Sequence, residues 1–191
     1  MAAASPETPA TTGIRTLEVR WIFPGELETP VVGWFARLTA ETETESREDA
    51  YLRPHLPGLS VKIRGGRALE VKVYQGSPGV LEVAGRARGR LESWQKWSFP
   101  CGQPSPGSGE AAGWRPVHKR RRIGWFPLAN EPALTRATGP GEEPRCAVEL
   151  TEVTTRGEAW WTLGFEATGP ADLVRSGLDG SCASLGWGFR V

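Results

Sequence analysis

Hydrophobic and polar residues alternate in short stretches along much of the chain. From Leu17 to Phe23 the odd-numbered positions are all apolar, whereas Glu18 and Arg20 between them are charged. Successive side chains of a β-strand point to opposite faces, so this period of two predicts a strand with one apolar and one charged face.

The same alternation returns in four later stretches, residues 59–64, 69–73, 148–151 and 161–166. Gly65 and Gly66 separate the first two stretches, and a turn containing Gly157 separates the last two, so each pair predicts a hairpin. Strands that repeatedly carry charges on one face either expose that face to solvent or close it into a polar lumen. The choice between these two decides the function.

The segments between these strands give weaker signals. Thr29 and Pro30 provide an N-cap and a first-turn proline for a short helix that runs to about Leu38. Residues 39–47 predict a solvated loop, and residues 48–52 a brief strand that carries Asp49 and Tyr51 into the sheet. Residues 80–83 and 86–99 are interpreted as one long or bent strand, and residues 114–126 as a strand with a basic run.

Strands joined mostly by turns predict a mainly β (α+β) fold, an antiparallel β-barrel with a helix after the first strand. We expect residues 1–13 to be a disordered tail and residues 14–191 to form a single domain. Loops are predicted at 101–113 and 127–145, and a short helix at 170–177.

Composition narrows the function classes. The 191 residues carry a net charge of +1, so no global field attracts nucleic acid or a membrane surface. No run approaches the roughly 20 apolar residues that span a bilayer, and we expect a soluble, cytoplasmic protein without a membrane partner. Three cysteines without a close pair, and only two histidines, do not favour a zinc site or a disulfide framework.

Charged residues recur on the predicted strands in a fixed order. The first strand carries Thr16-x-Glu18-x-Arg20, the hairpin carries Lys62-x-Arg64 and Glu70-x-Lys72, a later strand carries Lys119 and Arg121, and the last two carry Glu149 and Glu166. This order resembles the CYTH superfamily, the triphosphate tunnel metalloenzymes that include class IV adenylate cyclases and thiamine triphosphatases. The stretches from Leu17 to Trp21 and from Trp94 to Phe99 also resemble a divergent, uncharacterised bacterial branch of that superfamily.

The resemblance implies a barrel lumen that binds a phosphorylated small molecule or polyphosphate. Inward lysines and arginines would contact the phosphates, and carboxylates would hold Mg²⁺ or Mn²⁺ for metal-dependent triphosphate hydrolysis. By this resemblance the phosphate-binding residues are Arg20, Lys62, Arg64, Lys72, Lys119 and Arg121, and the metal-facing residues are Glu18, Glu149 and Glu166.

Three positions depart from the family pattern. Thr16, Thr151 and Gly164 stand where the family has acids, although Glu70 is a possible additional carboxylate. The basic residues of the site therefore match the family pattern more completely than the acidic residues do. We expect binding of an anionic ligand more readily than its hydrolysis.

Two other readings stay open. The barrel could be a non-enzymatic carrier of an apolar ligand, or bind a protein partner through its tryptophans, which predicts a lumen lined by Trp and Val. Alternatively, the run from His118 to Arg122 could contact RNA beside Trp114 and Trp125, although the balanced net charge makes nucleic acid the weaker interpretation. The sequence leaves the ligand, the metal and the oligomeric state open.

Overall fold

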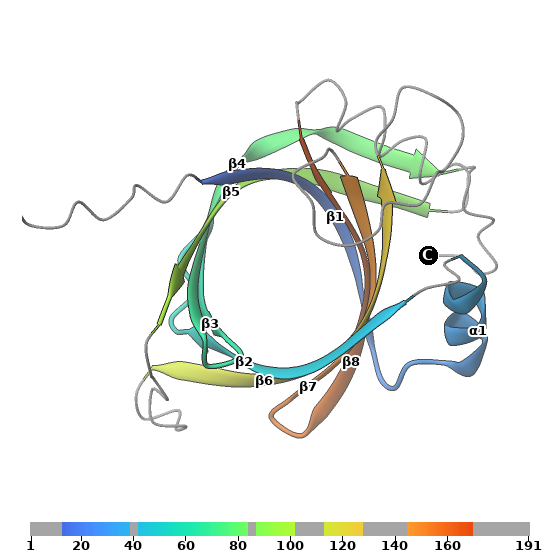
Figure 1. Ribbon diagram of the computed structural model, residues 1–191, viewed down its shortest axis with the longest axis horizontal. Coiled ribbons are helices and arrows are strands. Elements are labelled where there is room, and N and C mark those ends of the chain that lie inside the picture. The colour runs from blue at the N-terminus through green and yellow to red at the C-terminus, as the bar shows by residue number, and fades with distance from the viewer. Residues whose placement is uncertain (1–12, 39–41, 84–86, 102–112, 128–144, 170–191) are drawn as a thin grey trace, which may run out of the picture.

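The computed structural model describes residues 13–38, 42–83, 87–101, 113–127 and 145–169. Within these ranges eight strands form a closed antiparallel barrel, and one helix packs against its outside (Figure 1). The predicted mainly β barrel with a helix after the first strand is confirmed. The elements are β1 (Ile14–Pro24), α1 (Thr29–Leu38), β2 (Glu43–Leu52), β3 (Leu59–Arg64), β4 (Ala68–Val83), β5 (Ala87–Pro100), β6 (Trp114–Pro127), β7 (Arg145–Thr155) and β8 (Glu158–Thr168).

The strand order around the barrel is β1-β5-β4-β3-β2-β6-β7-β8. Two runs, β2 to β5 and β6 to β8, pair in sequence order, but β1 lies between β5 and β8, and β2 pairs with β6. Closure pairs every described strand on both sides and so removes the free sheet edges through which β-proteins aggregate.

The prediction of a loop over residues 39–47 is wrong for its second half. Strand β2 begins at Glu43, which pairs with Ile123 of β6. Residues 43–49 are polar at every position, so no apolar alternation marks this strand in the sequence. Its stability comes from pairing with β3 and β6, which only the closed barrel supplies.

The prediction of one long strand over 80–83 and 86–99 is also wrong. Residues 80–83 end β4, and the chain returns as β5, so that Glu82 pairs antiparallel with Arg88. Strand β4 instead continues through Gly76 and Gly79, where its register against β5 shifts. Both glycines have positive φ, at 116° and 128°, a backbone conformation that side chains disfavour. Beyond this bulge, the ends of β4 and β5 form what we call the β4–β5 extension (residues 79–83 and 87–91).

The hydrophobic core lies outside the barrel wall. Apolar side chains on the outer faces of β1, β7 and β8 pack against α1 and against the β4–β5 extension. Gly89 allows this close approach, because a Cβ at that position would lie 2.4 Å from Cγ2 of Val19. The core includes Leu17, Val19, Val31, Trp34, Phe35, Leu81, Ala87, Leu91, Cys146, Val148, Leu150, Trp161, Leu163, Phe165 and Ala167.

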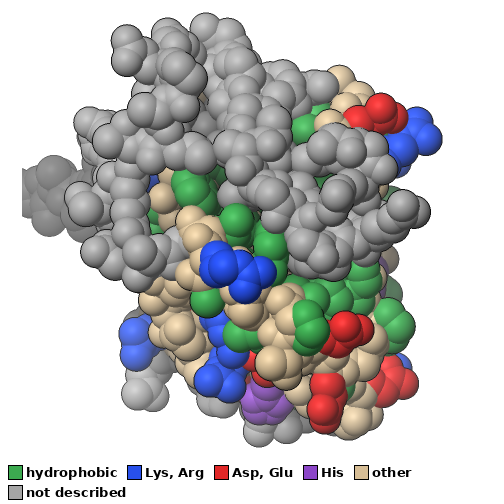
Figure 2. All heavy atoms as spheres, turned by 90° about the vertical axis from the view of Figure 1, so that its right-hand side faces the viewer, with side chains coloured by type: hydrophobic (Ala, Val, Ile, Leu, Met, Phe, Trp, Pro, Cys, Tyr) green, Lys and Arg blue, Asp and Glu red, His purple; other side chains and the backbone are tan. Residues whose placement is uncertain are grey.

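The outer surface on the α1 side carries side chains of both charges. Figure 2 shows basic and acidic side chains on this face, together with hydrophobic and other residues. In the described part of the chain, no helix is long and apolar enough to span a membrane. Apart from their edge residues, the predicted tail (1–13), the predicted loops (101–113 and 127–145) and the predicted helix (170–177) lie outside the described residues. The extent of the domain stays a prediction.

Candidate functional site in the barrel lumen

Charged side chains line the inside of the barrel. Arg20 on β1 contacts Glu149 on β7, although β8 lies between these strands. In the same way, Lys96 on β5 contacts Glu166 on β8 across β1. Two side chains that meet past an intervening strand must both point into the barrel. The sequence left open whether the charged faces look to solvent or to a lumen, and these contacts place them in the lumen.

Glu149 bridges two arginines. Its Oε2 lies 3.2 Å from Nη2 of Arg20, and its Oε1 accepts a hydrogen bond from Nη2 of Arg121. Each arginine has a second partner, since Arg20 Nη1 donates to Thr162 Oγ1 at 3.0 Å and Arg121 Nη1 donates to Glu45 Oε2 at 2.8 Å. Burial disfavours the charged carboxyl, but Arg20 and Arg121 lower the pKa of Glu149 to about 2. The carboxylate is therefore ionised at neutral pH.

Asp49 is the centre of a second group of cations. It is fully buried, with Arg47 at 2.8 Å, Lys119 at 3.1 Å and Lys62 at 3.3 Å from its oxygens. Against the effect of burial, Lys62 and Lys119 hold the pKa of Asp49 well below its usual value. Lys119 also donates to the Tyr51 hydroxyl, and the same two lysines lower the pKa of that phenol although burial raises it.

Glu70 connects this group to the rest of the lumen. Its carboxylate lies 3.0 Å from Lys62 Nζ and 3.1 Å from Arg64 Nη1. These two cations lower its pKa to about 2 against the opposing effect of burial. Arg64 also approaches Glu45 at 3.7 Å, so Glu45 joins the Asp49 group to the Glu149 group.

These contacts form two networks among the described residues. What we call the main network joins six basic side chains to four carboxylates and so carries two excess positive charges. The small network joins two lysines to two carboxylates. The main network consists of Arg20, Arg47, Lys62, Arg64, Lys119, Arg121, Glu45, Asp49, Glu70 and Glu149. The small network consists of Glu18, Lys72, Lys96 and Glu166.

The six cations predicted to bind phosphate all take part in these networks. Five of them belong to the main network, and Lys72 belongs to the small one, where Glu166 and Glu18 raise its pKa although burial lowers it. Their role as phosphate ligands stays a prediction.

Gly164 leaves space in the lumen for a neighbouring cation. This glycine lies under the guanidinium of Arg20, and a Cβ built there would come within 2.9 Å of Arg20 Cζ. An acidic side chain at position 164 would need the space that Arg20 now fills. The absence of a side chain at position 164 therefore leaves room for this cation in the lumen.

The carboxylates predicted to face a metal are instead each engaged by a cation. Glu18 contacts Lys72, Glu166 contacts Lys96, and Glu149 contacts two arginines. Among the described residues, no group of three or more His, Cys, Asp or Glu side chains is arranged to hold a metal ion. A divalent cation prefers several oxygen ligands free of competing cations, so this donor set does not fit Mg²⁺ or Mn²⁺.

The basic run from His118 to Arg122 does not form one surface patch. Lys119 contacts Asp49 in the lumen and Arg121 contacts Glu149 there. On the outer face, His118 contacts Glu48 at 3.0 Å and Arg122 contacts Glu152. The strand therefore divides the run between two faces, and acidic neighbours partly neutralise the outer one.

Sequence reasoning missed four members of the networks, Glu45, Arg47, Asp49 and Lys96. Glu45 and Arg47 fall in the segment predicted as a loop, yet both face the lumen and connect the Asp49 and Glu149 groups. The spacing of Glu45, Arg47 and Asp49 is a period of two, but the intervening residues are polar as well. No contrast between faces marked the inward side.

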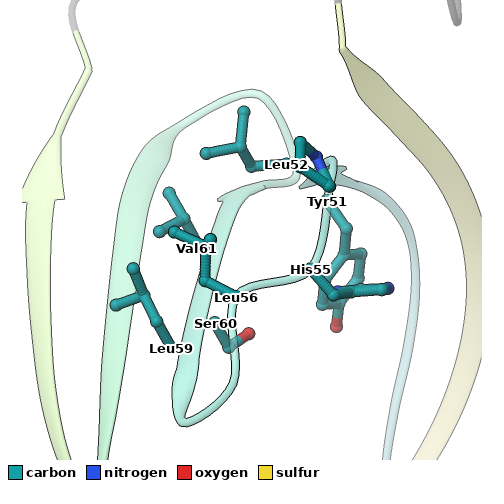
Figure 3. Close-up of a pocket in the computed structure, with 8 residues that line it drawn as sticks. Tyr51, Leu52, His55, Leu56, Leu59, Ser60 and Val61 are labelled. Carbon is teal, nitrogen blue, oxygen red and sulfur yellow. The ribbon is translucent and has the colours of Figure 1, made fainter.

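A small pocket adjoins the site at the end of β2. Figure 3 shows Tyr51 together with Leu52, His55 and Leu56 around it. The lining also includes Pro54, Leu59, Ser60 and Val61, so apolar side chains and polar groups share it. Tyr51 contributes its side chain to this pocket and its hydroxyl to Lys119.

No protein-family model matches the chain, and no curated protein matches it. The function must therefore be argued from the lumen itself.

Proposed function

We propose that the barrel lumen binds a phosphorylated or polyanionic small molecule, as in a divergent relative of the CYTH superfamily. The observation that carries this proposal is the charge of the main network, in which six basic side chains face four carboxylates in one closed lumen. An anion that enters would meet two uncompensated positive charges. Arginine offers paired donors that match phosphate oxygens, which favours a phosphoryl group over other anions.

The energetics of buried ion pairs also support a binding role. Desolvation of two charges commonly offsets their attraction, so apolar side chains would stabilise a barrel interior at least as well. Fourteen charged residues in the two networks are thus a weak source of stability. The charged lining also argues against a carrier of apolar ligands, because such a carrier needs an apolar lumen.

The carboxylates do not supply a metal site in the described residues, so we derive no hydrolytic step. Metal-dependent turnover stays a prediction of the family resemblance. It is tested in the same experiment as binding.

The experiment measures thermal unfolding with tripolyphosphate, ATP or thiamine triphosphate, each with and without Mg²⁺ or Mn²⁺. We expect at least one compound to raise the melting temperature, because a ligand that binds only the folded state stabilises it. Phosphate release is then measured for every compound that binds. A melting temperature unchanged by all three compounds would contradict the proposal.

Arg64→Gln tests where the anion binds. Arg64 contacts Glu70 and Glu45, but Lys62 still contacts Glu70 and Arg121 still contacts Glu45 after the change, so no carboxylate is left alone. One lost charge-assisted contact is worth about 1.5–3 kcal/mol, and we expect affinity to fall about tenfold or more.

Arg88→Gln is the matched control for Arg64→Gln. Arg88 is 74% exposed and pairs with Glu82 on the β4–β5 extension, outside both networks. Removal of this charge should leave affinity within about twofold of wild type. Equal losses in both variants would indicate a general charge effect rather than a lumen site.

A further inference from the structure

The Glu149 carboxylate lies between two guanidiniums of the lumen. It places one oxygen against each of two guanidiniums, which is the arrangement that a phosphate also adopts between arginines. Its side chain is only 8% exposed. An anion that enters the lumen therefore meets arginines that already hold an anion belonging to the protein.

The two arginines would stay in place if Glu149 moved away. Arg20 remains bonded to Thr162, and Arg121 remains bonded to Glu45. The absence of a side chain at Gly164 leaves the guanidinium of Arg20 seated against the wall. These second partners help to hold both arginines in place for another anion, and such preorganisation lowers the cost of binding.

A hydroxyl beside this pair has no partner in the part of the chain that the structure describes. Thr151 is 3% exposed, and its Oγ1 makes no hydrogen bond with any described residue. Thr151 pairs with Arg121 on one side and with Thr162 on the other, and it lies two residues from Glu149 on the same face of β7. A buried hydroxyl without a partner is unfavourable. If a ligand oxygen replaced the carboxylate, the Thr151 hydroxyl could donate a hydrogen bond to it.

We propose that Glu149 is an internal counter-ion that competes with the ligand, and that a phosphoryl group binds Arg20, Arg121 and the Thr151 hydroxyl by displacing its carboxylate. This inference rests on the proposed function and assigns Glu149 a role opposite to that of a metal ligand. The displaced carboxylate loses two cationic partners, and this loss is subtracted from the affinity of the ligand. Removal of its charge should therefore tighten binding.

The test measures the binding of tripolyphosphate by titration calorimetry, without divalent metal and at fixed ionic strength, for the wild-type chain and Glu149→Gln. We expect the variant to bind at least about tenfold tighter. Equal or weaker binding would overturn the inference. If Glu149 were instead a metal ligand, Glu149→Gln would leave binding without metal unchanged. The variant would lose only the increase in affinity that Mg²⁺ causes.

Glu82→Gln is the control for a general gain of positive charge. Glu82 is 70% exposed and pairs with Arg88 outside the lumen, so this variant should bind within about twofold of wild type. A gain as large as that of Glu149→Gln would also overturn the inference.

Glu149→Asp covers the case in which Glu149→Gln does not fold. It keeps the charge balance of the lumen but shortens the side chain by one methylene, so one carboxylate no longer reaches both arginines. We expect binding tighter than wild type, and equal or weaker binding counts against the inference.

The inference and the proposed function fail in different ways. If the wild-type chain binds tripolyphosphate and the Glu149 variants bind no better, the proposed function stands and the competition does not. If only the variants bind, the competition stands and the wild-type lumen is not a tripolyphosphate site. If none binds, both are wrong.

Discussion

Thr151→Val should stabilise the protein, although it changes a polar side chain in a charged lumen. The Thr151 hydroxyl is buried and has no partner among the described residues. An unsatisfied buried group costs about 1–3 kcal/mol, and valine has nearly the shape of threonine. We therefore expect the free energy of unfolding to rise by about 1 kcal/mol or more.

Thr162→Val provides the matched comparison on the neighbouring strand. Thr162 is paired with Thr151 and is 7% exposed, but its hydroxyl accepts a hydrogen bond from Arg20 at 3.0 Å. Hydrogen bonds to charged groups contribute about 1.5–3 kcal/mol, so this variant should be destabilised by about that amount. The same Thr→Val substitution is therefore expected to stabilise the protein at position 151 and to destabilise it at position 162.

Urea unfolding followed by far-ultraviolet circular dichroism measures both variants. Equal slopes of free energy against urea would show that only stability has changed. The reasoning is refuted if Thr151→Val is no more stable than wild type, or if the two variants lose the same stability. Either result would mean that the Thr151 hydroxyl has a partner in the folded protein.

Two further predictions concern acid stability and the packing of α1. Folding lowers the pKa of Glu70 from 4.5 to about 2 and also lowers the pKa of Asp49 from its unfolded value of 3.8. The two carboxylates therefore stabilise the folded protein above these unfolded values, and this stabilisation is lost as the pH falls toward 2. The free energy of unfolding should therefore fall steeply below pH 4.5, and Glu70→Gln should reduce that slope by up to about 1.4 kcal/mol per pH unit. Urea unfolding at several pH values measures the slope. An unchanged slope in Glu70→Gln would contradict the prediction. Phe35 is 1% exposed between α1 and the barrel wall, so Phe35→Ala should cost about 3–5 kcal/mol in the same assay, and a loss below about 1 kcal/mol would show that α1 contributes little.

Much of the barrel was predictable from local sequence. The alternation from Leu17 to Phe23 and the hairpin glycines Gly65 and Gly66 identify strands and turns because they depend only on neighbouring residues. The helix after the first strand was found from Thr29 and Pro30 for the same reason. The part of β2 that was missed, residues 43–47, is polar on both faces and gives no local contrast.

The sequence by itself determined which residues share a face of each strand, and therefore which charged side chains lie on the same side of the sheet. It did not determine whether those faces look outward or inward, because alternation is the same in both cases. Only closure of the barrel brought Arg20 to Glu149 past an intervening strand and made Glu45 a link between two groups of cations. Only the closed lumen put a cation beside each carboxylate predicted to face a metal, since these pairings join residues 28 to 129 positions apart in the chain.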